Sequence, residues 1–389
     1  MKKLYYFDYN ATTPLHSEVL DAMMPYLKDR YGNPSSSHIF GRETRAAVEK
    51  AREMVAKILG ADPSEIVFTS CGSESNNLAL KGLFSAHCKA KNHIITSSIE
   101  HPAILSTCSF LEESGYKVTY LPVDGNGRIS LSKLKESITE KTLLISIMHG
   151  NNEIGVLQPI AEIGEIAREK EVFFHTDAVQ TTGKIHIDVN QIKVDLLSLS
   201  AHKFYGPKGI GALYIRKGTE MHSIIHGGHQ EKNRRAGTEN VAGIVGLGMA
   251  CEIAMRDMDK EFKHLITLKE KLCNGLMKKI PKIRINCSFE NCMPNTLNVG
   301  FLAIEGESLL INLDLKGIAV STGSACSSGS VEPSHVLKAI GVPVEYIQGS
   351  IRFSIGRFTT SEDTDYLLEV LPPIVERLRS MSPLWDDKQ

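Results

Sequence analysis

Short apolar runs alternate with longer amphipathic segments between residues 66 and 215. The run Ile66–Thr69 precedes a helical pattern that starts near Glu74, and His93–Thr96 precedes another that starts after Pro102. Strands joined by helical crossovers form a mostly parallel sheet with helices on both faces, so we predict an α/β fold. The last runs leave little room for helices, and we expect an antiparallel edge among them. The other strand-like runs are Lys117–Leu121, Leu143–Ile147, Val172–His175, Leu196–Leu199 and Ala212–Ile215.

The pattern changes near Asp257. A long charged helix is expected from Asp257 through Lys279, then a strand over Asn295–Val299, a Ser/Gly-rich stretch and a closing helix from Glu362. These elements indicate a second, smaller α+β domain. We expect residues 15–257 to form the large domain and residues 1–14 with 258–389 to form the small one, which carries a polar loop at about 321–332.

The amino-acid composition argues against some classes of protein. The chain has 389 residues, of which 42% are hydrophobic and 23% charged, with a formal net charge of -1. This balance argues against a nucleic-acid partner. No segment has the apolar length of a signal peptide core or a membrane span, so we expect a cytoplasmic protein without membrane contact.

The eight cysteines are scattered along the chain, which suits a reducing compartment. Cys287 and Cys292 are the nearest pair, but no second pair or histidine pair follows at zinc-site spacing. We interpret these two residues as structural or incidental, and we expect no metal site.

Lys203 stands where an apolar strand gives way to a glycine-rich turn. The strand 194–199 leads into Ser200-Ala201-His202-Lys203, and Gly206-Pro207-Lys208-Gly209 follows. Open α/β sheets bind their ligands at the carboxyl ends of strands. Desolvation there lowers the pKa of an amine, which can then form a Schiff base with a carbonyl cofactor. The alternative is a solvated surface charge.

Two further strand ends carry candidate cofactor ligands. In the segment 70–77, small residues let the backbone at Gly72 and the Ser73 hydroxyl approach a phosphate, although a serine-rich helix cap would look the same. Asp177, just past the strand 172–174, could hold a pyridine nitrogen protonated, as a pyridoxal phosphate site requires, or could be a helix N-cap.

Two other turns carry polar side chains. His101 follows a strand and precedes Pro102, so its imidazole could stack on a planar ring and move protons, or it could be structural. Asn152, in the turn 151–155, could donate to a cofactor oxygen, or could be an ordinary turn residue.

The carboxyl-terminal part adds a cysteine and an arginine. Glycines and serines surround Cys326, which predicts an exposed loop that can present a thiolate nucleophile, unless the cysteine is merely tolerated there. Alternation in Ile351-Arg352-Phe353-Ser354 could point Arg352 inward, toward a substrate carboxylate. Arg357 is the rival candidate.

Taken together, these segments resemble the class I cysteine desulfurases of the NifS/IscS type, within the fold-type I pyridoxal-phosphate superfamily. The resemblance runs nearly end to end and keeps the order of the family's motifs. The motifs are Asp8-Tyr9-Asn10-Ala11-Thr12-Thr13-Pro14, Tyr31-Gly32-Asn33-Pro34-Ser35-Ser36, Glu100-His101-Pro102, Asn151-Asn152-Glu153-Ile154-Gly155, His175-Thr176-Asp177-Ala178-Val179-Gln180, Ser200-Ala201-His202-Lys203, Arg234-Arg235-Ala236-Gly237-Thr238-Glu239-Asn240, Gly323-Ser324-Ala325-Cys326 and Ile351-Arg352-Phe353-Ser354.

The resemblance implies a role for each matching residue. Lys203 would hold pyridoxal 5'-phosphate as a Schiff base, Asp177 would pair with the pyridine nitrogen, and Gln180 would donate to the ring hydroxyl oxygen. His101 would stack on the ring, and Asn152 and Arg352 would bind the substrate carboxylate, with Asn33 near the same site. The phosphate would be held by Gly72, Ser73, Ser200 and His202, and by Thr238 of a neighbouring subunit in a homodimer.

The implied reaction converts L-cysteine to L-alanine. Lys203 would remove the α-proton, and the Cys326 thiolate would attack the substrate sulfur to form an enzyme persulfide. The sulfur would pass to an iron–sulfur scaffold protein or another acceptor. A selenocysteine lyase, an aminotransferase or kynureninase-like enzyme, and a catalytically silent scaffold are the alternatives.

Three positions depart from the family's usual pattern. Cys71 stands where a small Gly or Ala is common, Ser73 where Thr is common, and His229 where Gly is usual. The hydroxyl at Ser73 is kept, so phosphate binding is expected to survive that change.

Overall fold

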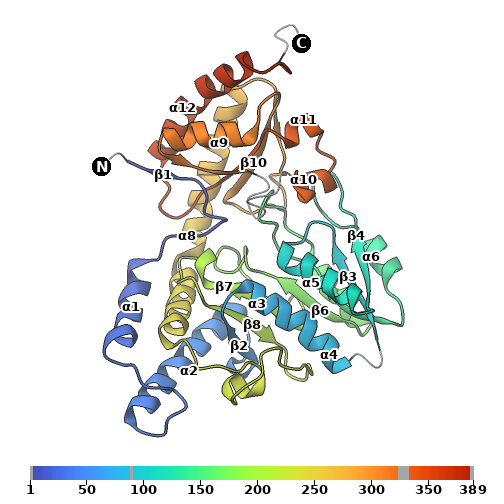
Figure 1. The fold of residues 1–389 in the computed structure, drawn as a ribbon, viewed down its shortest axis with the longest axis vertical. Helices are drawn as coiled ribbons and strands as arrows, with labels where there is room; N and C mark the ends of the chain where they lie inside the picture. The colour runs from blue at the N-terminus through green and yellow to red at the C-terminus, as the bar shows by residue number, and fades with distance from the viewer. Residues whose placement is uncertain (1–2, 88–90, 323–332, 386–389) are drawn as a thin grey trace.

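A seven-stranded sheet forms the centre of the larger part of the molecule (Figure 1). The computed structural model describes residues 3–87, 91–322 and 333–385. All neighbouring strands of this sheet pair in parallel except those that pair with β8, which runs antiparallel to both of its neighbours. In spatial order the strands are β2 (Ile66–Thr69), β8 (Gly211–Ile215), β7 (Leu196–Ser200), β6 (Phe173–Asp177), β5 (Thr142–Ser146), β3 (His93–Ser97) and β4 (Lys117–Leu121).

Both faces of this sheet are covered. Successive strand residues contribute to different apolar cores: Ile95 and Leu197 belong to one, and Ile94 and Leu196 to the other. Side chains alternate across a strand, so this division means that helices pack on both sides, as predicted. The helices of this part are α1 (Ser17–Lys28), α2 (Ile39–Leu59), α3 (Gly72–Asn77), α4 (Leu83–His87), α5 (Pro102–Glu113), α6 (Leu131–Ser137) and α7 (Ile160–Glu169), with short turns η1 (Pro63–Glu65), η2 (Leu78–Gly82), η3 (Ala201–Lys203) and η4 (Gln230–Asn233).

The antiparallel strand does not lie at an edge. β8 pairs with β2 on one side and β7 on the other, so the expected antiparallel edge is instead an internal strand. Six of the seven strands therefore point their carboxyl ends to the same side of the sheet.

A smaller α+β unit packs at the other end of the molecule, at the top of Figure 1. Its four-stranded antiparallel sheet has the order β12-β13-β10-β9. Phe301, Leu309, Phe353 and Leu371 are among the side chains of its own apolar core. The elements are β9 (Ile283–Ile285), β10 (Thr296–Phe301), α9 (Gly306–Leu315), β12 (Ser321–Thr322), α10 (His335–Ala339), α11 (Val344–Ile347), β13 (Ser350–Ser354) and α12 (Ser361–Ser380), with a parallel pair of β1 (Tyr5–Tyr6) and β11 (Ile318–Ala319).

One long helix, α8 (Val241–Lys279), connects the two parts. The charge pattern predicted a helix only from Asp257, because the glycine-rich first half looks unfavourable for a helix. Those glycines allow close packing: a Cβ at Gly248 would lie 2.8 Å from the Cα of Ala51 in α2. The boundary expected between residues 257 and 258 falls inside this helix and stays a prediction.

The amino-terminal segment ties the small unit to the large sheet. Tyr9 N donates to Ser354 O at 3.1 Å, and Ser354 N donates to Phe7 O at 2.8 Å. A few residues later, Thr13 N donates to His202 O at 2.9 Å. Residues 7–13 therefore run from β13 to the turn that carries Lys203. Across the described ranges, no helix combines the length and apolarity that a membrane crossing requires.

Candidate active site

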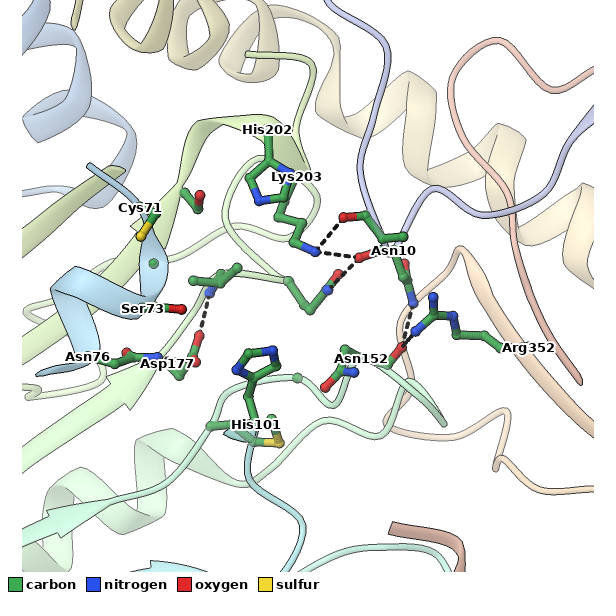
Figure 2. Close-up of a pocket in the computed structure, with 17 residues that line it drawn as sticks. Asn10, Cys71, Ser73, Asn76, His101, Asn152, Asp177, His202, Lys203 and Arg352 are labelled. Carbon is green, nitrogen blue, oxygen red and sulfur yellow. Dashed lines mark hydrogen bonds between the residues drawn. The ribbon is translucent and has the colours of Figure 1, made fainter. Parts of the chain in front are cut away.

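A cavity of about 370 Å³ lies where the carboxyl ends of the parallel strands meet the small unit (Figure 2). Its size fits a cofactor-sized ligand. Segments far apart in the sequence contribute to it, because parallel strands bring their carboxyl ends to one edge of the sheet. The lining residues are Asn10, Ala11, Cys71, Gly72, Ser73, Asn76, His101, Met148, Gly150, Asn152, Asp177, Val179, Gln180, Ser200, His202, Lys203 and Arg352.

Lys203 lies in the turn η3, directly after β7. Its Nζ donates to the backbone oxygen of Asn10 at 2.6 Å and to that of Ala11 at 2.9 Å. Figure 2 shows the side chain directed toward the central space. The amino-terminal segment thus orients the amine through main-chain oxygens, so substitution of the side chains at positions 10 and 11 would leave these two acceptors in place.

Asp177 is the last residue of β6 and is buried. Asn76 Nδ2 donates to its Oδ2 at 2.7 Å, and Val179 N donates to its Oδ1 at 2.9 Å. A buried carboxylate requires such donors to offset the loss of water. No α-helix begins at Asp177, and the hydrogen bond from Val179 is a local turn, so the helix-cap alternative does not apply.

Gln180 lies between two lysines. Its Oε1 accepts a hydrogen bond from Lys184 Nζ at 3.3 Å, and its Nε2 donates to Asn10 O at 3.0 Å. Lys184 is fully enclosed, and burial, followed by the charge of Lys203, lowers its pKa to about 7. Because Lys184 donates to Oε1, the Gln180 amide is oriented with its NH₂ group toward Asn10 O.

His101 has a structural role and also lines the cavity. Its Nδ1 accepts a hydrogen bond from Ala103 N at 3.1 Å and thereby caps α5, while the ring also lines the cavity. Burial lowers the pKa of this imidazole, with a smaller lowering effect from Lys203. A neutral ring is the form suited to lying flat against another aromatic ring.

One end of the cavity is rich in small and hydroxylated residues. The Ser200 hydroxyl is buried and has no hydrogen-bond partner in the parts of the chain that the structure describes. A Cβ at Gly72 would come within 2.7 Å of Val179 Cγ2, so the backbone there lies unusually close to its neighbours. Ser73 is exposed at the start of α3, and burial lowers the pKa of His202 to about 4.

The opposite end contains Arg352, which is only 2% exposed. Its Nη2 donates to Asp8 Oδ1 at 2.7 Å and its Nη1 to Asn152 O at 3.0 Å, while its Nε has no partner among the described residues. The rival, Arg357, lies outside the cavity and binds Glu261. Arg352 is therefore the arginine available to a ligand here.

Two of the predicted residues do not line this cavity. Asn33 and Thr238 are exposed and absent from its walls, and Asn33 Oδ1 accepts a hydrogen bond from Ser35 N at 2.9 Å. Cys326 lies outside the described residues. The two exposed residues would need a second subunit to act at a cavity of this kind.

Several buried polar residues around the cavity were missed as candidates. Asn10 stood in a quoted motif and Asn76 in the segment 70–77, but neither was given a role. Burial raises the pKa of Glu100 and Glu153 and lowers that of Lys184. A signal was present for Asn76, since it shares one short helix with Gly72 and Ser73. Asn10 acts through its main-chain oxygen, which leaves no side-chain signal.

The donor set fits pyridoxal phosphate. The unpaired Ser200 hydroxyl and the close backbone at Gly72 suit a phosphate, Asp177 suits a protonated pyridine nitrogen, and Lys203 supplies an amine. No cluster of three or more His, Cys, Asp or Glu side chains suited to a metal ion occurs in residues 3–87, 91–322 and 333–385.

Comparison with known proteins gives consistent matches. The family model described as Aminotransferase class-V matches residues 5–367. A protein named cysteine desulfurase IscS from Dictyoglomus turgidum is 56% identical over 383 residues, which are 98% of this chain and 97% of the relative. Another of that name, from Methanosarcina thermophila, is 54% identical over 382 residues, covering 98% and 94% of the two chains.

Solved structures agree in fold. A NifS-like protein superposes with a TM-score of 0.92 at 44% identity, covering 97% of this chain and all of that one. The apo structure of a cysteine desulfurase from Thermococcus onnurineus gives a TM-score of 0.86 at 26% identity, covering 96% of this chain and 95% of that one. The predicted α/β fold with a smaller α+β unit is thereby confirmed.

Proposed function

The chain belongs to the class-V aminotransferase family and is a pyridoxal-phosphate-dependent cysteine desulfurase, and we propose that Lys203, Asp177 and Cys326 carry its reaction. The observation that supports this most is the meeting of Lys203 and Asp177 in one cavity with a buried, unpaired Ser200 hydroxyl. The substrate is L-cysteine and the organic product is L-alanine.

The residues around Lys203 hold the cofactor. Asp177, oriented by Asn76, keeps the pyridine nitrogen protonated, and His101 packs on the ring. Bound pyridoxal phosphate supplies an electron sink for the carbanion that forms at the substrate α-carbon. Gly72, Ser73, Ser200 and His202 bind the phosphate, and Gln180, oriented by Lys184, donates to the ring hydroxyl oxygen.

Substrate binding and proton movement follow from the same geometry. Arg352 and Asn152 bind the α-carboxylate of cysteine. With pyridoxal phosphate and substrate bound, Lys203 Nζ would remove the α-proton. The main-chain oxygens of Asn10 and Ala11 orient that amine at the cavity wall.

Sulfur transfer is assigned to Cys326. Its thiolate attacks the substrate sulfur, an S–S bond forms, and the carbon–sulfur bond breaks with its electron pair going to the substrate carbon. Protonation of that carbon yields alanine and leaves a persulfide on Cys326. The sulfur then passes to an iron–sulfur scaffold protein or another acceptor in the cytoplasm.

The active form is proposed to be a homodimer. Thr238 and Asn33 are exposed and lie outside the cavity of their own chain, which supports a contribution to the partner's site. Thr238 would then reach the phosphate bound by the other subunit.

The test is the Cys326→Ala holoenzyme. It should keep the cofactor's visible absorbance and still bind cysteine, but it should release no sulfide under reductant. Sulfide release at the unsubstituted rate would contradict the assignment of the nucleophile. Assays with selenocysteine and for keto-acid formation distinguish a selenocysteine lyase and an aminotransferase, respectively.

A further inference from the structure

The connection between β9 and β10 carries two half-buried cysteines that the desulfurase reaction does not use. The Cys287 thiol donates a hydrogen bond to the sulfur of Cys292, and Asn298 N donates to Cys287. The two thiols are therefore neighbours, and Cys292 Sγ also lies 3.6 Å from Ile154 O. Sequence spacing alone had favoured a structural or incidental role for this pair.

A buried lysine faces the same sulfur. Lys269 of α8 is only 4% exposed, and its Nζ lies 3.1 Å from Cys292 Sγ and 3.0 Å from Met293 O. The exposed ring of Phe289 lies over the ammonium, 5.1 Å from centroid to Nζ. A buried ammonium is stabilised by an anionic neighbour, and a thiolate at Cys292 supplies one.

The pKa values of the two thiols are shifted in opposite directions. The hydrogen bond from Cys287, and then the charge of Lys269, lower the pKa of Cys292 to about 6. The hydrogen bond to Cys292 and burial raise the pKa of Cys287. Cys292 is thus the nucleophile of the pair at neutral pH, and Cys287 stays protonated beside it.

We propose that Cys287 and Cys292 form a redox-active dithiol, with Cys292 as the attacking thiolate, that a peroxide converts into a disulfide. The Cys292 thiolate attacks a peroxide oxygen, the O–O bond breaks, and a sulfenic acid and hydroxide form. Hydroxide takes the proton of Cys287, whose thiolate sulfur then attacks the Cys292 sulfur and displaces hydroxide, and this hydroxide becomes water by taking up the proton that the Cys292 thiol had released to solvent. Two thiols and one hydrogen peroxide yield one disulfide and two waters.

Oxidation of this pair is coupled to the substrate end of the cavity. Cys292 forms a β-bridge with Val156, and Met293 N donates to Gly155 O at 2.7 Å. Both partners belong to the turn that begins at Asn151 and carries Asn152. A disulfide draws the sulfurs to about 2.0 Å, so the dithiol strand shifts against this turn. Weaker binding of the α-carboxylate follows, a consequence that rests on the proposed function.

The disulfide is expected to be easily reduced. Oxidation removes the thiolate, so the buried Lys269 ammonium loses its anionic neighbour. It keeps the hydrogen bond that it donates to Met293 O. Stabilisation of the reduced form in this way makes a dithiol pair more oxidising, which is the property of regulatory rather than structural disulfides.

The chemistry is tested on Cys326→Ala holoenzyme, so that peroxide cannot act at Cys326. After hydrogen peroxide treatment, alkylation and digestion, mass spectrometry should find a Cys287–Cys292 cross-linked peptide, while buried Cys108 and Cys251 stay alkylatable after denaturation. In Cys287→Ser, dimedone should instead trap a sulfenic acid at Cys292. Absence of the cross-linked peptide would overturn the proposal.

The role of Lys269 is tested by rate. Lys269→Met should slow disulfide formation about 10-fold at pH 7, and Lys269→Arg should restore the rate, because the arginine keeps the charge. Iodoacetamide provides a test in which Lys269 is unchanged. The rate at which it alkylates Cys292 should rise with pH and reach a plateau near pH 7. Reactivity that keeps rising tenfold per pH unit through pH 8 would contradict an activated thiolate.

Coupling to the site is tested with L-alanine, which is not a thiol and cannot reduce the disulfide. Its dissociation constant, followed by cofactor absorbance, should rise about threefold or more on oxidation and return after reduction and removal of the reductant. The Cys287→Ser/Cys292→Ser variant should show no change. An unchanged constant with the disulfide present would overturn the coupling, whereas alanine that failed to bind even the reduced protein would contradict the proposed function.

Discussion

Asn76 Nδ2 donates to Asp177 Oδ2 at 2.7 Å, and both side chains are buried. The second oxygen of the carboxylate accepts from Val179 N at 2.9 Å. Both oxygens are therefore fixed in orientation by donors from outside the cofactor. A hydrogen bond to a buried charged group contributes about 1.5–3 kcal/mol, so Asn76 is a positioning residue of some weight.

Substitution Asn76→Ala should weaken binding of pyridoxal phosphate about 10-fold, since the Asp177 carboxylate loses its buried donor. The cofactor's absorbance spectrum should change as well, because the protonation of its ring nitrogen depends on this carboxylate. Titration of the apoprotein with cofactor gives both readouts. Asn77→Ala is the matched control: Asn77 bonds Ser73 O on the exposed side of the same helix and should leave both unchanged.

Substitution Arg352→Lys should raise KM for cysteine about 10- to 100-fold, because an ammonium cannot reproduce the fork of the guanidinium toward a carboxylate. The rate at saturating cysteine should fall much less. Steady-state kinetics of alanine formation separate the two parameters. A loss confined to kcat would place Arg352 elsewhere in the reaction.

Arg357→Gln provides the comparison, since Arg357 binds Glu261 and Asp257 outside the cavity. Loss of the arginine removes the cationic partner of the buried Glu261 carboxylate and leaves it, among the described residues, only the Tyr205 hydroxyl as a donor, which should lower the free energy of unfolding by about 3 kcal/mol. KM for cysteine should stay within about twofold. Urea unfolding and the same kinetic assay measure the two effects.

Glu153 makes stability depend on pH. Burial raises its pKa to about 7, opposed by the hydrogen bond from Ser334 Oγ at 2.5 Å and by Arg352. The folded protein therefore binds more protons than the unfolded chain between about pH 4.5 and 7, so the contribution of Glu153 is largest below that window and falls as pH rises through it. Glu153→Gln should remove this dependence.

Between pH 5 and pH 8, the free energy of unfolding of Glu153→Gln should rise, relative to that of the unsubstituted protein, by up to about 3 kcal/mol. Urea unfolding at both pH values measures the difference. Glu345→Gln, an exposed position on α11, serves as the control and should show no such trend. A constant difference at the two pH values would contradict a protonated carboxyl at position 153.

Mixed dimers test whether Thr238 serves the partner's site. Co-expressed Lys203→Ala and Thr238→Asp chains should form hybrid dimers with one intact site, which combines Lys203 of one chain with Thr238 of the other. Such hybrids should recover up to about half the activity of the unsubstituted dimer, whereas each variant alone should be nearly inactive. If Thr238 acted within its own chain, the hybrids would be inactive too.

The strands of the large sheet could be predicted because each is a buried apolar run that ends at a polar turn. Ile66–Thr69 and Leu196–Ser200 are examples. The two-residue strands β1, β11 and β12 carry too little pattern to be recognised. The start of α8 was missed for a different reason: its glycines are unfavourable for an isolated helix, and tertiary packing accounts for them, with Gly246 against Met23 and Gly248 against Ala51.

Part of the cavity could also be predicted from the sequence, because the geometry of a parallel sheet brings its residues together. Lys203 and Asp177 follow neighbouring parallel strands, so their meeting is a consequence of sheet geometry. Alternation along β13 indicated the inward direction of Arg352. The contribution of Asn10 was not accessible, because it depends on how residue 10 folds against Asn152 and Lys203, and its acceptor is a main-chain oxygen.

The segment that includes Asn10 is synthesised well before its partners Thr296 and Ser354. Tyr9 and Phe7 hydrogen-bond Ser354, and the Asn10 side chain donates to Thr296 Oγ1. A nascent chain therefore cannot close this wall of the cavity until β13 has been made. Completion of the cofactor site consequently awaits the synthesis of β13, and a ribosome-bound fragment that ends before β13 lacks the partners that hold residues 7–10 in place.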